Sequence, residues 1–316
     1  SQNPSTTNRS ITVVVNDGAN NSNTATTTIS INPVNDISVV TLDNTSSFTE
    51  GNTNLSVINN LTITDSDNTT LNAASVTLTN NLDGITNEKI SLTTTQINDA
   101  FNDFGITIDI STDNVISLSG NSLIANYQTV MSQIVYNNTS DNPNTTNRTL
   151  DIVVNDGTAN STTVSSTISM GAINDAPIID LDNTTAGNNF ATSFTEDNPA
   201  IAISNAATIT DVDNANMTSA TITLTNNLDG ITDENITLTA AQITAADGLG
   251  ITVNVATNNV ISLSGSSSIA NYQTVINQIV YNNTSQNPST TNRYITVLIN
   301  DCTANSNTAT TTISIN

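Results

Sequence analysis

Three segments of the chain carry consecutive β-branched and apolar residues and end in Asn-Asp: SITVVVND (10–17), TLDIVVND (149–156) and YITVLIND (294–301). Uninterrupted runs of this kind predict buried strands. TATTTISIN (24–32) instead alternates apolar with polar residues, which predicts a hairpin partner for the first run across the Asn-Asp-Gly turn. The runs VTLTNN (76–81) and ITLTNN (222–227) predict further half-buried strands.

One apolar pattern has the spacing of a helix rather than of a strand, and it occurs twice. Its first copy falls on one helical face and comprises Ile124, Tyr127, Val130, Met131 and Ile134. Its second copy comprises Ile269, Tyr272, Val275, Ile276 and Ile279. The pattern predicts one short helix per copy, packed on the strands, with both tyrosines in the core rather than in a ligand site.

The chain repeats itself with a period of roughly 140 residues, because residues 1–32 recur as residues 285–316 with six differences and a diverged copy begins at Asn142. This period is far too long for a solenoid coil and suits one β-sandwich per repeat. We therefore predict the tail of one repeat (1–32) and two full repeats (33–172 and 173–316), in a polypeptide that continues in both directions. The predicted fold class is all-β, with tandem antiparallel β-sandwich domains and one short helix per repeat.

The composition removes several classes of function. There are 27 acidic residues against 4 basic ones, for a formal net charge of −23. Nucleic-acid binding needs clustered Lys and Arg, so nucleic acid is excluded as a partner. Histidine is absent and Cys302 is the sole cysteine, so neither a catalytic triad nor a zinc site can be assembled. Paired carboxylates could serve glycoside hydrolysis, but we expect no enzyme. No stretch approaches the ~20 apolar residues of a membrane-spanning helix.

Internal repetition shows which acidic residues keep their place in each copy. They lie in the Asn-Asp turn, in an Asn-Asp linker, and in the motifs FTE, TDxDN and NLDG. The residues concerned are Asp17, Asp156 and Asp301, Asn35, Asp36, Asn174 and Asp175, Glu50 and Glu196, Asp65, Asp67, Asp211 and Asp213, and Asp83 and Asp229. Acids in turns commonly cap their own backbone, and this accounts for Asp83 and Asp229.

Capping of the backbone does not account for the two acidic residues of the TDxDN motif. We expect Asp65 and Asp67 to lie on an extended segment, where alternate side chains point to one side. Two carboxylates then converge at a cost in free energy unless a cation lies between them. Ca²⁺ takes about six to eight oxygen ligands, largely carboxylates and carbonyls. The motif therefore predicts calcium ligands, with solvated turn acids as the alternative.

The order of these motifs resembles the cadherin-like (Ig-like β-sandwich) repeats of large bacterial surface and adhesin proteins, and the resemblance covers the whole chain. In that family Ca²⁺ ions lie between successive sandwiches and stiffen the linker. The resemblance implies one ligand set made of Asn35, Asp36, Asp65, Asp67 and Asp156. It implies a second set made of Glu50, Asn174, Asp175, Asp211, Asp213 and Asp301.

The chain departs from the family pattern at two points. Pro33 and Ala172 stand where the family has an Asp two positions before the linker Asn, and a mid-domain Asp-x-Glu has no clear counterpart. Fewer carboxylates imply fewer ions, or more weakly bound ions, at each junction.

Three of the four basic residues, Arg9, Arg148 and Arg293, occupy one position of the repeat, in TTNR. A role in solubility alone would not place them so regularly. We expect a fixed guanidinium that bonds loop carbonyls or an acid of its own repeat, Asp83 or Glu88 in the case of Arg148. Contact with a partner is the alternative.

Together these patterns predict an extracellular, bacterial segment of a giant surface protein, acting as a structural or adhesive stalk, filament or coat. Its partners would be neighbouring repeats of the same protein, with homotypic assembly or a cell-surface ligand beyond them. One alternative is a glycan- or cell-binding module, which needs exposed aromatics that are scarce here. Another is a self-assembling fibre subunit completed by strand exchange. Residues 1–32 are too short to fold alone, so we expect a partner sheet for Val13, Val14, Val15, Ile29 and Ile31.

Overall fold

The chain forms two compact units in a computed structural model that describes residues 3–43, 45–257 and 259–316. The first unit extends to Ile173 and the second comprises Asn174–Asn316. The finer division of the first unit into 1–32 and 33–172 stays a prediction, and residues 1–2 of that segment lie outside the described residues. Each unit is mostly β-structure, so the predicted all-β class of tandem sandwiches is confirmed.

The first unit contains one sandwich and one separate hairpin. The six-stranded sheet of the sandwich follows the order β4 (Thr45–Thr49), β13 (Val164–Gly171), β12 (Arg148–Asn155), β7 (Thr70–Leu78), β10 (Val115–Leu123) and β9 (Thr107–Asp109). A three-stranded sheet comprises β5 (Leu55–Ser56), β11 (Val135–Asn138) and β8 (Glu88–Ser91), and a ribbon comprises β3 (Val39–Thr41) and β6 (Thr62–Thr64). The pairing is antiparallel except between β4 and β13, which are parallel.

The second unit repeats this sandwich. Its six-stranded sheet follows the order β15 (Phe190–Phe194), β24 (Ala309–Ile315), β23 (Arg293–Asn300), β18 (Asn216–Leu224), β21 (Val260–Ser268) and β20 (Thr252–Thr257). Its three-stranded sheet comprises β16 (Ile201–Ala202), β22 (Val280–Asn283) and β19 (Glu234–Thr237), and its ribbon comprises β14 (Ile178–Asp180) and β17 (Thr208–Thr210). Again one pair, β15 with β24, is parallel.

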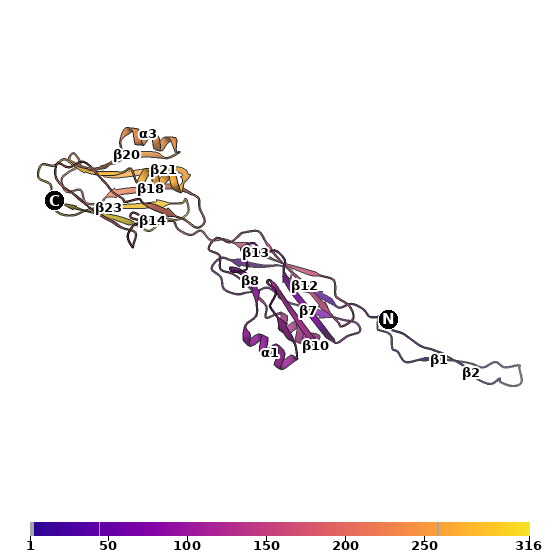
Figure 1. The fold of residues 1–316 in the computed structure, drawn as a ribbon. Coiled ribbons are helices and arrows are strands. Elements are labelled where there is room, and N and C mark those ends of the chain that lie inside the picture. Colours follow the sequence, from indigo (N-terminus) through magenta and orange to yellow (C-terminus); the bar gives the residue numbers. More distant parts are fainter. Residues whose placement is uncertain (1–2, 44, 258) are drawn as a thin grey trace. The chain divides into compact units, whose positions relative to one another are not determined.

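Each sandwich carries the predicted helix and a second helix that the apolar pattern did not predict. The predicted helices are α2 (Ile124–Met131) and α4 (Ile269–Ile276), whose tyrosines are fully buried as expected. The additional helices are α1 (Thr94–Phe104) and α3 (Ala240–Gly248). In its own unit, α1 packs beside β9. In the other unit, α3 packs beside β20 (Figure 1). Both additional helices begin with a capping box, Thr93 with Gln96 and Thr239 with Gln242, which satisfies free backbone N–H groups.

The core of each sandwich is aliphatic, with few aromatic side chains. In the first, Phe48 meets Tyr136 edge to face with ring centroids 5.1 Å apart. In the second, Phe194 meets Tyr281 in the same way at 5.5 Å. Such pairs add to the stabilisation from burial. This kind of core agrees with the composition, in which only 3% of the residues are aromatic.

The N-terminal hairpin, β1 (Arg9–Val13) with β2 (Ala25–Ile29), pairs antiparallel as predicted. It has the register of the hairpin that ends each sandwich, β12 with β13 and β23 with β24, which we call the terminal hairpins. Every residue of β1 and β2 is exposed, whereas the two terminal hairpins contribute to the cores. A β-hairpin that packs against nothing is marginally stable in water.

The turn of the last terminal hairpin holds a side chain in a backbone conformation that favours glycine. Cys302 has φ of 102°, and the equivalent residues Gly18 and Gly157 have φ of 97° and 100°. A Cβ at Gly157 would lie 2.5 Å from Nδ2 of Asn72. The second sandwich has the shorter Thr218 at the position of Asn72, and the Cys302 side chain is exposed.

We expect Cys302→Gly to raise the free energy of unfolding of the second sandwich by roughly 0.5–1 kcal/mol, because strain at positive φ is released and exceeds the entropy cost of a new glycine. Urea unfolding monitored in the second sandwich measures the change. Cys302→Ala is the control, since it removes the thiol but keeps a Cβ at positive φ. An equal gain from the alanine variant would contradict the backbone explanation.

Candidate functional site

The two TDxDN motifs form turns rather than the extended segments that we predicted. Asp65 Oδ1 accepts hydrogen bonds from the backbone N–H groups of Asp67 (2.9 Å) and Asn68 (2.8 Å), so the segment bends. Asp211 Oδ1 does the same for Asp213 (3.0 Å) and Asn214 (2.7 Å). The physical premise of alternate side chains on a strand was therefore wrong, because one oxygen of the first Asp in each motif caps a turn.

The turn nevertheless brings the predicted residues of the first sandwich together, in what we call the first Asx cluster: Asn35, Asp36, Asp65, Asp67 and Asp156, with Asn68. Asn35 Nδ2 donates to Asp156 Oδ2 at 2.9 Å, and Asn35 Oδ1 accepts from Asn68 Nδ2 at 3.2 Å. The backbone N–H of Asp36 donates to Asp67 Oδ2 at 2.7 Å. The linker is thereby fastened to the TDxDN turn and to the Asn-Asp-Gly turn.

The second sandwich holds an equivalent second Asx cluster: Asn174, Asp175, Asp211, Asp213 and Asp301, with Asn214. Asn174 Nδ2 donates to Asp301 Oδ2 at 2.8 Å, and Asn214 Nδ2 donates to Asn174 Oδ1 at 2.7 Å. The backbone N–H of Asp175 donates to Asp213 Oδ2 at 2.6 Å. A hollow of about 340 Å³ lies beside Asp175 and Asp211.

Within the part of the chain that the structure describes, both Asx clusters leave buried carboxylate oxygens without a hydrogen-bond partner. In the first cluster these are Asp36 Oδ2 and Asp67 Oδ1, and in the second they are Asp211 Oδ2 and Asp213 Oδ1. A buried acceptor without a donor costs free energy. Each cluster thus offers two carboxylate oxygens from neighbouring acids as ligands, and such oxygens are the ligands that a hard cation prefers.

One sequence difference explains why Asp211 Oδ2 is unpaired while the equivalent Asp65 Oδ2 is not. Asp65 Oδ2 accepts a hydrogen bond from the Ser38 hydroxyl at 2.7 Å. The residue at the position of Ser38 in the second sandwich is Pro177, which carries no donor. Asp211 Oδ2 therefore remains unpaired.

The deepest acids of the clusters are held in the ionised state. Burial raises the pKa of Asp156, but hydrogen bonds from the Asn35 side chain and from the backbone of Ala159 and Thr158 outweigh it, so that the pKa lies below its ordinary value. The pKa of Asp301 is lowered in the same way, with burial opposed by the backbone of Ala304 and the Asn174 side chain. Both carboxylates are negative at neutral pH.

The Asx clusters do not by themselves complete a metal site. Among the described residues, no three acidic, histidine or cysteine side chains come close enough together to hold one ion. Asparagine oxygens, backbone carbonyls and water would have to fill the remaining positions. Glu50, assigned to the second ligand set, accepts a hydrogen bond from the backbone N–H of Ile173 through Oε2 at 2.8 Å. Its role as a ligand stays a prediction.

A second cluster in each sandwich confirms the predicted role of the arginines. Arg148 is fully buried, with Nη2 2.6 Å from Asp83 Oδ2 and Nε 2.5 Å from Glu88 Oε1. Its Nη1 donates to the carbonyl oxygens of Asn144 and Thr146. Both acids named from the sequence are therefore partners at once. The prediction that Asp83 caps its own turn was wrong, because its carboxylate accepts bonds from Arg148, from Asn138 and from the backbone N–H of Asn144.

Tyr and Asn side chains complete this arginine cluster, which comprises Arg148, Asp83, Glu88, Tyr136 and Asn138. The Tyr136 hydroxyl donates to Glu88 Oε1 and Asn138 Nδ2 donates to Asp83 Oδ2, both at 2.7 Å. Burial and the Glu88 carboxylate raise the pKa of Tyr136 well above its ordinary value. The second sandwich repeats the arrangement with Arg293, Asp229, Glu234, Tyr281 and Asn283. The cluster is a buried network of ion pairs and hydrogen bonds that stabilises the sandwich, not an accessible binding site.

Arg9 differs from the other two arginines. In the described part of the chain it forms no ion pair, and its guanidinium donates to the Thr7 carbonyl oxygen. Its position in the repeat predicts a fixed guanidinium, but the acids that fix Arg148 and Arg293 come from the body of a sandwich. The prediction is therefore confirmed for Arg148 and Arg293. Arg9 has no acidic partner in the described part of the chain.

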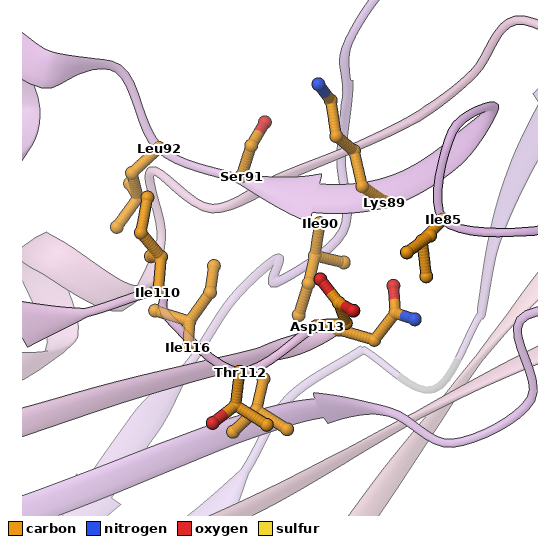
Figure 2. A pocket seen from close by; sticks show the side chains of 11 residues that line it. Ile85, Lys89, Ile90, Ser91, Leu92, Ile110, Thr112, Asp113 and Ile116 are labelled. Atoms are coloured by element: carbon orange, nitrogen blue, oxygen red, sulfur yellow. The ribbon is translucent and has the colours of Figure 1, made fainter.

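A pocket of about 300 Å³ opens on the first sandwich between β8 and residues 110–116 (Figure 2). Ile90, Leu92 and Ile116 form its buried apolar side, and Figure 2 shows the Lys89 side chain directed away from them. None of its lining residues is aromatic, although stacking aromatics are what the glycan-binding alternative needs. Asn235 stands at the position of Lys89 in the second sandwich, so the charge is not repeated.

Comparisons with known proteins give similarity of structure only. No protein-family model and no curated protein matches the chain. Extracellular cadherin domains 3–6 of Protocadherin Gamma B2 are 12% identical with a TM-score of 0.36, over 98% of this chain and 57% of that one. Mouse Cadherin-23 domains 22–24 are 11% identical with a TM-score of 0.30, and the match covers 90% of this chain and 67% of that one. Domains 4–9 of the surface layer protein SbsC are 14% identical with a TM-score of 0.23, over 98% and 35%.

The class of protein follows from the chain's own topology. Two units with the same strand order, each a sandwich with one parallel and otherwise antiparallel pairings, define a tandem β-sandwich protein. It is similar in structure to cadherin-domain repeats and to a surface layer protein. The chain spans a little over half the length of the protocadherin fragment. No helix among the described residues combines the length and apolarity needed to cross a membrane.

Proposed function

We propose that the chain is an extracellular structural or adhesive segment of a surface protein, in which Ca²⁺ bound at the Asx cluster of each sandwich stiffens the array. The observation that carries this proposal is that both Asx clusters hold unpaired, buried carboxylate oxygens among the described residues, and that one of them, Oδ1 of Asp67 and of Asp213, is equivalent in the two sandwiches. Recurrence in two diverged copies argues against a chance defect of packing. The surplus of 23 negative charges supports the same role, since it keeps an exposed, repetitive surface from associating non-specifically.

In the first sandwich, Asp36, Asp65, Asp67 and Asp156 would supply carboxylate ligands and Asn35 an amide oxygen. In the second, Asp175, Asp211, Asp213 and Asp301 would supply carboxylates and Asn174 an amide oxygen. A bound cation neutralises the mutual repulsion of these acids. It would also tie the linker residues to two turns of the sandwich, which reduces the freedom of the linker.

We expect millimolar Ca²⁺ to stabilise both sandwiches, by about 2.7 kcal/mol wherever its concentration is a hundredfold above the dissociation constant. Thermal unfolding with calcium and with a chelator measures this effect. Small-angle scattering under the same two conditions measures the largest dimension of the particle, which depends on how stiff the linker is. Chelation should shorten this dimension. Identical unfolding and scattering curves with and without chelator would contradict the proposal.

Variants make the test specific to one cluster. Asp211→Ala combined with Asp213→Ala should abolish the calcium effect in the second sandwich and leave the first unchanged. Asp99→Ala combined with Asp103→Ala is the matched control, because both acids are exposed on α1 and the change in net charge is the same. Loss of the calcium effect in this control would assign it to charge screening rather than to a site.

A further inference from the structure

The two Asx clusters share most of their hydrogen bonds. The linker Asn donates to the acid of the Asn-Asp turn at 2.9 Å in the first cluster and at 2.8 Å in the second. The next linker residue donates its backbone N–H to the second Asp of TDxDN at 2.7 Å and 2.6 Å. The first Asp of that motif caps its own turn in both clusters. A difference between the clusters therefore stands out against a common frame.

The clearest such difference lies at the position of Ser38 and Pro177. Ser38 is 1% exposed, and its hydroxyl donates to Asp65 Oδ2 at 2.7 Å. Pro177 carries no donor. In the described part of the chain, the equivalent oxygen, Asp211 Oδ2, is buried without a hydrogen-bond partner. The same carboxylate oxygen is thus occupied in the first cluster and open in the second.

A carboxylate oxygen that already accepts a hydrogen bond is a poorer ligand than an open one. A cation that binds Asp65 Oδ2 must displace the buried Ser38 hydroxyl or share the oxygen with its proton. Either event costs free energy comparable to that of a hydrogen bond to a charged group. A cation that binds Asp211 Oδ2 displaces no donor, and it relieves the cost of a buried, unpaired acceptor.

The other unpaired oxygens do not cancel this difference. Oδ1 of Asp67 and Oδ1 of Asp213 are unpaired and buried alike. In the linker, Asp36 has an unpaired Oδ2, and the equivalent Asp175 is exposed, so its carboxylate is free to turn towards a cation. The linker acid is therefore open to a cation in both clusters. Only in the second cluster can both acids of the TDxDN turn bind the cation without the loss of a hydrogen bond.

We infer that the residue at this position, Ser38 or Pro177, sets the calcium affinity of its cluster, so that the second Asx cluster fills at a lower Ca²⁺ concentration than the first. The inference rests on the proposed function, because it concerns the same clusters. The hydrogen bond at stake corresponds to a difference of roughly tenfold in affinity. Between the two concentrations only the second sandwich is loaded, so the chain responds to calcium in two steps.

A calcium titration of the intact chain, followed by nuclear magnetic resonance, tests the order of filling. The backbone amides of Asp67 and Asn68 report on the first cluster, and those of Asp213 and Asn214 report on the second, because they donate to the first Asp of each turn. The second pair should reach its midpoint at roughly tenfold lower Ca²⁺. Equal midpoints, or the reverse order, would overturn the inference and leave the proposed function standing. No response of either pair to millimolar Ca²⁺ would overturn both.

Substitutions at this one position should move the two midpoints in opposite directions. Ser38→Ala opens Asp65 Oδ2 and should lower the midpoint of the first cluster by roughly tenfold. Pro177→Ser supplies a hydroxyl beside Asp211 and should raise the midpoint of the second cluster. Pro177→Ala is its control and should leave that midpoint unchanged, because it removes the ring without adding a donor. Midpoints that do not move in Ser38→Ala and Pro177→Ser overturn the inference.

The stability of the first sandwich separates an effect on affinity from a defect of packing. In chelator, Ser38→Ala leaves Asp65 Oδ2 buried and unpaired, so unfolding of this sandwich should shift to lower urea concentration. Saturating calcium should recover the loss. Ser165→Ala is the matched control, because Ser165 also donates to an acid, Asp151 Oδ1 at 2.6 Å, but does so between β13 and β12. It should move neither calcium midpoint. A loss in Ser38→Ala that calcium does not recover counts against the inference.

Discussion

Arg148→Ala is expected to destabilise the first sandwich by roughly 3–5 kcal/mol, because it leaves the buried carboxylate of Glu88 without its counter-ion. Glu88 is fully buried, and besides the guanidinium it accepts bonds from Tyr136 and from the backbone of Leu82 and Asp83, none of which carries a positive charge. Chemical unfolding with hydrogen exchange read on β12 measures the change. Arg148→Lys should lose roughly 1–3 kcal/mol, since one ammonium cannot bond two acids and two carbonyls.

The repeat supplies matched controls for this prediction. Arg293→Ala should have the same effect on the second sandwich and none on the first. Arg9→Ala, at the same repeat position but without an acidic partner, should change neither sandwich by more than about 0.5 kcal/mol. Adding Glu88→Gln to Arg148→Ala should recover part of the loss, because it removes the uncompensated charge. A loss from Arg148→Ala no larger than that from Arg9→Ala would contradict the role of the ion pairs.

Gly120→Ala is expected to cost the first sandwich roughly 2–4 kcal/mol, from backbone strain and steric overlap together. Gly120 has φ of 132°, and a Cβ there would overlap the carbonyl oxygen of Gly105. The residue lies in β10 beside the end of α1, and its own carbonyl accepts the Tyr127 hydroxyl at 2.7 Å. Any shift of β10 that relieves the overlap also disturbs this buried bond.

Gly105→Ala separates the two causes of this loss. Gly105 also has a positive φ, of 69°, but a Cβ there would meet no atom within 4 Å. Its expected cost is about 1 kcal/mol, from conformation alone. Gly265→Ala and Gly250→Ala repeat the comparison in the second sandwich. Equal losses from Gly120→Ala and Gly105→Ala, measured by urea unfolding, would show that the close approach is absorbed without cost.

The sequence predicted elements whose signal is local or repeated. The paired strands of the hairpins and the helices at Ile124 and Ile269 have strong apolar periodicity. The α1 helix does carry a helical apolar pattern, Ile97, Ala100, Phe101 and Phe104, which the sequence analysis did not use. The α3 helix buries only Ala246 completely and shows little apolar pattern. Their capping boxes were the available signal. The parallel pairing of β4 with β13 joins residues more than 120 positions apart, which no local pattern reveals.

The sequence predicted some residues of the candidate sites but not others. Recurrence of acids in two copies identified both Asx clusters, and the acids of the arginine cluster could be named because they share its repeat. The wrong premise about TDxDN came from assigning an extended conformation to residues that form a turn. Tyr136 and Asn138 were not foreseen, because they reach Glu88 and Asp83 only through the pairing of β11 with β8. The importance of the difference between Ser38 and Pro177 could not be predicted, because it depends on the hydrogen bond from Ser38 to Asp65, which only the structure shows.

The parallel pair in each sandwich has a mechanical consequence. β4 begins where the chain enters the six-stranded sheet, and β13 ends where the chain leaves it, with register from Thr45 opposite Thr167 to Thr49 opposite Gly171. Tension applied along the polypeptide pulls these two strands in opposite directions parallel to their length. The hydrogen bonds between them are then loaded together in shear, rather than broken one after another from an end. Rupture under load therefore requires the whole ladder to fail at once.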